Sequence, residues 1–292
     1  MTGLFKFLSA APLWFAHALG GCLGWLAFGF SRQYRQRLLD NARQAGLNRW
    51  QALASVGSAG QQIAELPRLW FGKNVPIQWQ GEQHIDAALA SGQGIVFLTP
   101  HLGCFEVTAQ AYALRYGQAG KPMTVLYRPP RKAWLMQLIT TARRRPGLDT
   151  APTSLAGVKQ MIKALKNGES VGLLPDQVPP AGQGVWSPFF GRQAYTMTLS
   201  VRLALQTRAI ILIAWGERLP WGRGFKINVS PLPTASASAT GQTERLAERR
   251  QLARDLEGAV RQVNAAMESL IRTAPQQYLW GYARYKTPKV ES

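Results

Sequence analysis

Short apolar runs alternate with helical stretches through the middle of this 292-residue chain, and this order restricts the fold more than any other feature. The apolar runs lie at 94–100, 121–129, 169–177, 209–217 and 224–232. Helical stretches follow or separate them at 105–117, 131–145, 154–168 and 196–207. Strands alternating with helices predict an α/β fold, with a mixed, mostly parallel central sheet flanked by helices.

Further helices are expected on both sides of this region. Apolar and basic positions at helical spacing predict a helical subdomain over 31–74. A Pro/Gly-rich loop is expected from the end of the third run to Pro188, and a flexible loop over 233–243. Residues 244–273 are then expected to form a long amphipathic helix.

The segment from Leu8 to Phe30 contains 23 residues without Asp, Glu, Lys or Arg. This length suffices for a helix to cross a hydrocarbon core of roughly 30 Å. Its glycines weaken the segment as a membrane span, and its aromatic residues suit a helix lying in the membrane interface. A buried core helix is the third possibility. We therefore divide the chain into a membrane helix or anchor at 1–30 and a catalytic or binding domain at 31–292.

The charges around this segment indicate its orientation. Lys6 precedes it, whereas Arg32, Arg35 and Arg37 follow it. This is the reverse of a cleaved signal peptide, and the positive-inside rule places the remainder of the chain on the cytoplasmic side of the inner membrane.

Scarce carboxylates give the chain a large positive charge. It has 34 Lys and Arg against 15 Asp and Glu, a net charge of +19, while 46% of the residues are hydrophobic. That apolar fraction excludes a disordered chain, and the charge implies an anionic partner such as nucleic acid, anionic lipid or an acidic carrier protein. Only Cys22 and Cys104 are cysteines, so we expect no disulfide framework and no zinc site.

One histidine is placed for chemistry. His101 follows the apolar run at 94–100, and Glu106 lies five residues on, in the first turn of the next helical stretch. At the carboxyl end of a strand the two side chains can converge, and an ionised carboxylate holding an imidazole makes a general base. The plainer interpretation is a capped turn with a surface histidine. The sequence contains no GxSxG motif, so catalysis by a nucleophilic serine is disfavoured.

Two further strand ends carry candidate binding residues. Arg128 follows the run MTVLY, and Asp176 with Gln177 follows VGLLP. Arg128 belongs to a stretch without acidic residues whose cations are Arg115, Lys121, Arg128, Arg131, Lys132, Arg143, Arg144 and Arg145. A guanidinium at a strand end suits a phosphate, and the other cations form either a docking surface or a solvated face.

Four blocks of the sequence resemble the bacterial lipid A late acyltransferases, the lauroyl and myristoyl transferase family within the lysophospholipid acyltransferase group. The blocks are TPHLGCFEV, VLYRPP, LLPDQVPPAGQGVWSPFFGRQAYT and PQQYLWGYARYK. The first is similar to the family's H-x4-(D/E) block. It departs at Cys104 and Phe105, where Asn and Trp are frequent in the family.

The resemblance implies O-acyl transfer without a cofactor or metal. His101 would take the proton of the acceptor's hydroxyl and Glu106 would orient the imidazole, while Arg128, Asp176 and Gln177 would bind substrate. The donor would be the thioester of an acyl carrier protein, or acyl-CoA, and the acceptor an anionic lipid, most simply a lipid A precursor. Another hydroxylated lipid, such as an aminolipid or a lysophospholipid, is the alternative acceptor.

Two interpretations from other functional classes remain open beside acyl transfer. The basic charge and interleaved aromatic residues suit a nucleic-acid-binding protein, although no helix-turn-helix, RRM or zinc-finger pattern is present, so no nucleic-acid partner is expected. A membrane-associated scaffold without catalysis is the other. The sequence leaves the oligomeric state and the acyl chain length open.

Overall fold

A seven-stranded sheet forms the centre of the protein in a computed structural model, which describes residues 2–130, 132, 136, 138–139, 142–143, 145–233 and 256–290. The strand order is β1-β9-β8-β2-β5-β3-β4. The strands are β1 (Ile77–Gln80), β2 (Ile95–Leu98), β3 (Met123–Tyr127), β4 (Leu148–Pro152), β5 (Ser170–Leu173), β8 (Ile210–Arg218) and β9 (Phe225–Pro231). All neighbours pair in parallel except β8 and β9, so the predicted mixed, mostly parallel sheet is confirmed.

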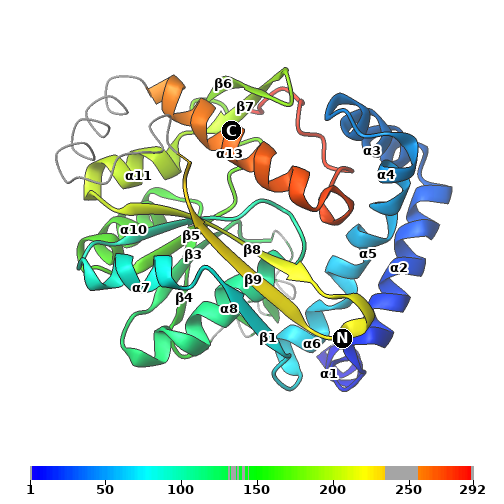
Figure 1. Cartoon of the computed structure of the whole chain (residues 1–292), viewed down its shortest axis with the longest axis horizontal. Coiled ribbons are helices and arrows are strands. Elements are labelled where there is room, and N and C mark those ends of the chain that lie inside the picture. The colour runs from blue at the N-terminus through cyan, green and yellow to red at the C-terminus, as the bar shows by residue number, and fades with distance from the viewer. Residues whose placement is uncertain are drawn as a thin grey trace.

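Helices cover both faces of this sheet (Figure 1). Within β2, Ile95 and Phe97 enter one apolar cluster while Val96 and Leu98 enter the other, as expected of a strand buried on both faces. The first cluster includes α7 (Gln83–Ala90) and α8 (Phe105–Arg115). The second includes α10 (Leu155–Lys166), α11 (Leu199–Thr207) and α13 (Leu256–Thr273).

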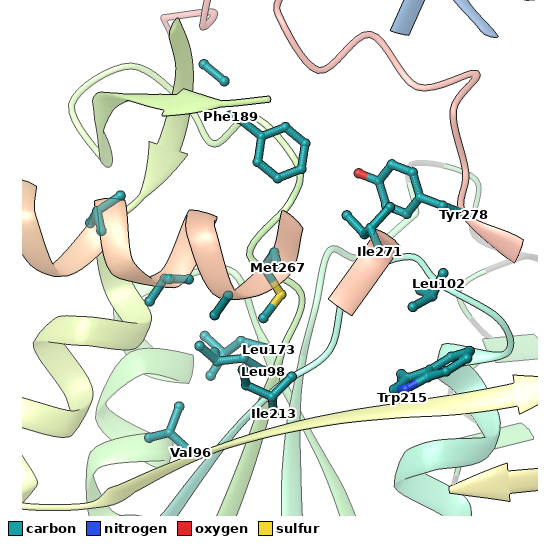
Figure 2. Packing of buried hydrophobic residues seen from close by; sticks show 14 of the residues in the cluster. Val96, Leu98, Leu102, Leu173, Phe189, Ile213, Trp215, Met267, Ile271 and Tyr278 are labelled. Carbon is teal, nitrogen blue, oxygen red and sulfur yellow. The ribbon is translucent and has the colours of Figure 1, made fainter. Parts of the chain in front are cut away.

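The closing helix α13 builds the deepest part of the second cluster. The Met267 side chain of this helix points toward Leu98, Leu173 and Ile213, which belong to three adjacent strands (Figure 2). A separate antiparallel hairpin of β6 (Gly184–Phe189) and β7 (Arg192–Met197) lies against this helix. The core therefore joins the sheet to elements from the far end of the chain.

The N-terminal helices pack onto the body. They are α1 (Thr2–Ser9), α2 (Leu13–Phe30), α3 (Arg32–Gln44), α4 (Arg49–Ala54), α5 (Val56–Ala64) and α6 (Leu66–Phe71). Glycines bring α2 and α5 into backbone contact, since a Cβ added at Gly60 would lie 1.9 Å from the Gly20 carbonyl oxygen, and one at Gly24 2.4 Å from that of Val56. α2 is long and apolar enough to cross a membrane, and 28% of its residues are buried in the protein.

The local sequence predictions differ from the structure at four strands. The loop predicted up to Pro188 contains strand β6, and the stretch predicted as helical from 196 begins as strand β7, so the helix starts at Leu199. Strands β1 and β4 were not predicted, because they are short and partly polar. The predicted loop from residue 234 onward and the start of the helix predicted from 244 lie outside the described residues.

Candidate active site

His101 lies where strand β2 ends, and Asp176 lies where the adjacent strand β5 ends. The two strands pair in parallel from Ile95 with Ser170 to Leu98 with Leu173, and the Thr99 backbone N–H extends the ladder to the Leu173 carbonyl. Parallel strands end at the same edge of a sheet, so residues 75 positions apart in sequence meet there.

Asp176 holds His101 at two points. Its Oδ1 accepts from His101 Nδ1 at 2.8 Å, and its Oδ2 accepts from the His101 backbone N–H at 2.9 Å. The second ring nitrogen, Nε2, lies 3.0 Å from the amide nitrogen of Gln177. A carboxylate only accepts and an amide NH₂ only donates, so Nδ1 carries the proton and Nε2 presents its lone pair.

The pKa of Asp176 reflects this contact. Burial alone would raise it, but the charge and hydrogen bonds of His101, with a smaller effect from the charge of Arg284, lower the pKa below its ordinary value. Asp176 is 2% exposed and His101 is partly accessible. The result is an ionised carboxylate that fixes one nitrogen of the imidazole, while the other nitrogen meets the Gln177 amide.

The C-terminal segment closes around this pair. The backbone N–H of Leu279 donates to the His101 carbonyl, and Tyr282 Oη accepts from the Val178 backbone N–H. Burial and the charge of Asp176 raise the pKa of Tyr278 well above its usual value, so this phenol remains neutral. Arg284 is 3% exposed and donates to the Tyr195 carbonyl and the Thr196 hydroxyl.

Glu106 has different partners from those expected. It lies in the first turn of α8, as predicted, but its carboxylate accepts from Arg143 at 2.8 and 2.7 Å and from the Trp70 indole at 2.9 Å. Both ring nitrogens of His101 are engaged elsewhere. Glu106 therefore does not orient the imidazole directly, as the sequence analysis expected, because Asp176 occupies that position.

The basic stretch is also less free than its sequence suggests. Arg143 pairs with Glu106, Arg115 lies 3.7 Å from Glu82, and Arg145 donates to the Leu69 carbonyl. Arg128 follows β3 at the same sheet edge as His101 and is exposed. Acidic side chains from outside the stretch therefore face Arg143 and Arg115, and neither belongs to an unpaired basic face. Arg131 and Arg144 lie outside the described residues.

A buried polar network supports the loop after His101. Glu65 Oε1 and Oε2 accept from Arg218 at 2.9 and 3.0 Å, and Oε2 also lies 3.1 Å from His17 Nε2. Arg218 donates onward to the Gly103 carbonyl at 3.2 Å, which also accepts from Gln62 at 3.0 Å. Burial would raise the pKa of Glu65, but Arg218 and His17 lower it to about 2.

Sequence reasoning missed this network. Its members come from α2, α5, the start of α6 and the end of β8, so no local pattern joins them. The sequence offered one signal for it: Arg218 is a charged residue at the end of an apolar run, where buried residues are expected. In the described part of the chain, no three His, Cys, Asp or Glu side chains gather closely enough to hold a metal ion.

Comparison with known proteins identifies relatives of one kind. The family model of the bacterial lipid A biosynthesis acyltransferases matches residues 2–287. The chain is 28% identical to the lipid A biosynthesis lauroyltransferase of Escherichia coli over 79% of its length and 70% of that protein. It is 27% identical to a lipid A biosynthesis acyltransferase of Haemophilus influenzae over 72% of its length and 59% of that protein.

A relative with another acceptor also matches. The phosphatidylinositol mannoside acyltransferase of Mycobacterium tuberculosis is 28% identical over 68% of the chain and 63% of that protein. The match of the family model over nearly the whole chain shows that this protein is an acyltransferase of the bacterial lipid A biosynthesis acyltransferase family.

Proposed function

We propose that the protein moves a fatty acyl chain from the thioester of an acyl carrier protein to a hydroxyl of a lipid A precursor, with His101 as general base. The observation that carries this proposal is the fixed imidazole: Nδ1 is held by Asp176, and Nε2 meets only the neutral amide of Gln177, which a substrate hydroxyl can replace. A neutral imidazole in this tautomer accepts a proton from an alcohol.

Gln177 marks the position of the acceptor hydroxyl. Its amide donates to His101 Nε2 at 3.0 Å, which is the geometry an acceptor O–H would need. When the hydroxyl takes this place, the amide is released to bind another polar group of the substrate. Gln177 is accordingly a substrate-binding residue in the proposal.

The reaction transfers one proton to His101 and returns it to the leaving group. The acceptor oxygen attacks the thioester carbonyl carbon as Nε2 takes its proton, and the tetrahedral intermediate carries the negative charge on the carbonyl oxygen. Its collapse breaks the C–S bond, and the imidazolium returns the proton to the departing thiolate. Asp176 stabilises the imidazolium throughout, as a carboxylate does in hydrolytic triads. A thioester is already activated, so this route uses positioning and acid–base chemistry alone.

Glu106 enters the proposal as a positioning residue. It binds Arg143 bidentately and accepts from Trp70, and so fixes the segment after β3 against α8 and α6. Arg128, exposed at the end of β3, is proposed to bind an acceptor phosphate.

Membrane association belongs to the same proposal. The outer face of α2 carries the exposed side chains Trp14, Phe15, Leu19, Leu23, Trp25, Leu26 and Phe30. The opposite face is fixed to α5 through Gly20 and Gly24. We propose that α2 lies along the inner membrane with its apolar face in the interface, on the cytoplasmic side, where the charge of +19 favours anionic lipids.

The acceptor and the donor each have an alternative. A relative is named for a phosphatidylinositol mannoside acceptor, and this supports another phosphorylated lipid with a free hydroxyl as the second candidate acceptor. Acyl-CoA is the second candidate donor.

The test is acyl transfer by purified protein in mixed vesicles, followed by mass spectrometry of the lipids. We expect a lipid A precursor to gain one acyl group from an acyl carrier protein thioester faster than from acyl-CoA. His101→Ala is expected to lower the rate by at least ~10², a typical contribution of a general base. His84→Ala, a histidine on α7, is the matched control. Near-normal turnover by His101→Ala would contradict the mechanism.

A further inference from the structure

The turn between β8 and β9 presents an exposed tryptophan in a constrained backbone. Trp221 is 88% exposed and has φ 59° and ψ 26°, a left-handed conformation. For a residue with a side chain this conformation is unfavourable, and such outliers persist where the surroundings enforce them. Folding gains nothing from the exposed indole, so its placement calls for another explanation.

The backbone around Trp221 is held firmly. Leu219 N–H donates to the Gly224 carbonyl at 3.0 Å, and Phe225 N–H donates to the Pro76 carbonyl at 3.0 Å. A Cβ at Gly222 would lie 2.3 Å from the Trp14 backbone nitrogen, so the turn lies directly against the first turn of α2. Figure 1 shows the end of this hairpin beside α1 and the beginning of α2.

The turn therefore extends the apolar surface of α2. Trp14 and Phe15, at the start of α2, are 58% and 44% exposed, and Phe7 on α1 is exposed as well. The exposed Arg223 supplies a cation next to the indole. Tryptophan prefers the boundary between headgroups and acyl chains, and arginine binds phosphate oxygens, so this combination matches an anionic bilayer surface.

We infer that the β8–β9 turn is a second membrane contact, which inserts Trp221 into the interface of an anionic bilayer beside α1 and α2. The inference rests on the proposed membrane association of α2 and adds an element about 200 residues away in sequence. Because β8 also carries Arg218, which donates to the Gly103 carbonyl, this contact would fix the orientation of the His101 loop relative to the bilayer.

The test places an environment-sensitive fluorophore on the turn. In a Cys22→Ser background, Trp221→Cys is labelled with NBD; the remaining Cys104 is buried. The matched control is Gln93→Cys, at an exposed position before β2, at the opposite sheet edge from His101. Vesicles of phosphatidylethanolamine with phosphatidylglycerol are compared with vesicles of phosphatidylcholine alone.

We expect blue-shifted emission at position 221 on the anionic vesicles, quenching by nitroxide-labelled lipid, and neither effect at position 93. The unlabelled Trp221→Ser variant is expected to bind these vesicles roughly fivefold or more weakly, by loss of buried apolar area. Unchanged emission at position 221 in protein that sediments with the vesicles would overturn the inference while leaving membrane association intact. A shift that appears without vesicles and grows with protein concentration would also overturn it, because the turn would then contact another protein copy. Failure to sediment at all would instead refute the membrane association itself.

Discussion

Neutralising Glu65 is expected to destabilise the protein strongly and to change its response to acid. Glu65 is 1% exposed and is the carboxylate that Arg218 binds through two nitrogens. Glu65→Gln keeps the size of the side chain but leaves the guanidinium buried without a counter-charge. Removing one partner of a buried ion pair typically costs about 3–5 kcal/mol.

The pKa of Glu65 gives an independent magnitude. Its pKa falls from 4.5 to about 2 in the folded protein, against the effect of burial, because of Arg218 and His17. At ~1.4 kcal/mol per pH unit, this corresponds to roughly 3 kcal/mol of stability. A carboxylate with a lowered folded pKa contributes this stability fully above its unfolded pKa, and the contribution disappears as the pH falls from about 4.5 toward 2.

The assay is urea unfolding followed by tryptophan fluorescence, at pH 7 and at steps down to pH 3. The wild type is expected to lose stability over the acid steps more steeply than Glu65→Gln does. Glu82→Gln is the matched control, because Glu82 lies 3.7 Å from Arg115 with both side chains partly exposed, and such a pair is worth under ~1 kcal/mol. Equal free energies of unfolding for the two Gln variants, with parallel acid profiles, would refute the reasoning.

Three other substitutions test the site and its support. Asp176→Asn is expected to lower kcat by ~10² to 10⁴ with little change in acceptor KM, because the imidazole loses its tautomer and the stabilisation of its charged form; equal kcat would contradict this. Glu106→Gln is expected to lower activity less than Asp176→Asn does, since Glu106 touches Arg143 and Trp70 and not the imidazole; kinetics of the two purified variants decide the order. Gly60→Val is expected to separate α2 from α5, since its Cβ would meet the Gly20 carbonyl oxygen; a lower melting temperature and faster proteolysis near residue 30 are the measurements, and an unchanged melting temperature would count against the close packing.

Buried strands were the most predictable part of this fold. A run such as 94–100 is apolar on both faces because helices cover both sides of the sheet, and so it stands out in the sequence. β6 contains a proline and follows a Pro/Gly-rich segment, and among the described strands it pairs with β7 alone, so its local pattern indicates a loop. Strand ends, and hence the positions of His101, Arg128 and Asp176, could be predicted for the same reason as the strands.

The partner of His101 could not be predicted locally. Glu106 is five residues away, whereas Asp176 is 75 residues away and meets His101 only because β5 lies next to β2 in the sheet. Strand order depends on crossover connections that leave no short-range pattern. The carboxylate nearest in sequence instead meets Arg143, a residue that sequence analysis assigned to a free basic stretch.

The glycines of α2 carry a second lesson. In the sequence, Gly20 and Gly24 only weaken an apolar segment as a membrane span. In the structure they allow the α5 backbone to approach, and this contact fixes one face of the helix and leaves the other exposed. Helix pairing of this kind depends on a partner that is more than thirty residues away, and a single segment does not reveal it.

Nitrogen NMR of the histidine rings tests the central claim most directly. The chain has three histidines, so ¹⁵N-labelled protein compared with His84→Gln and His17→Gln assigns the His101 signals. We predict that the neutral form of the ring carries its proton on Nδ1 and leaves Nε2 unprotonated, and that this preference is lost in Asp176→Asn. A proton on Nε2 with a bare Nδ1 in the wild-type protein would contradict the account, since the nitrogen facing the substrate would then be unable to accept the acceptor's proton.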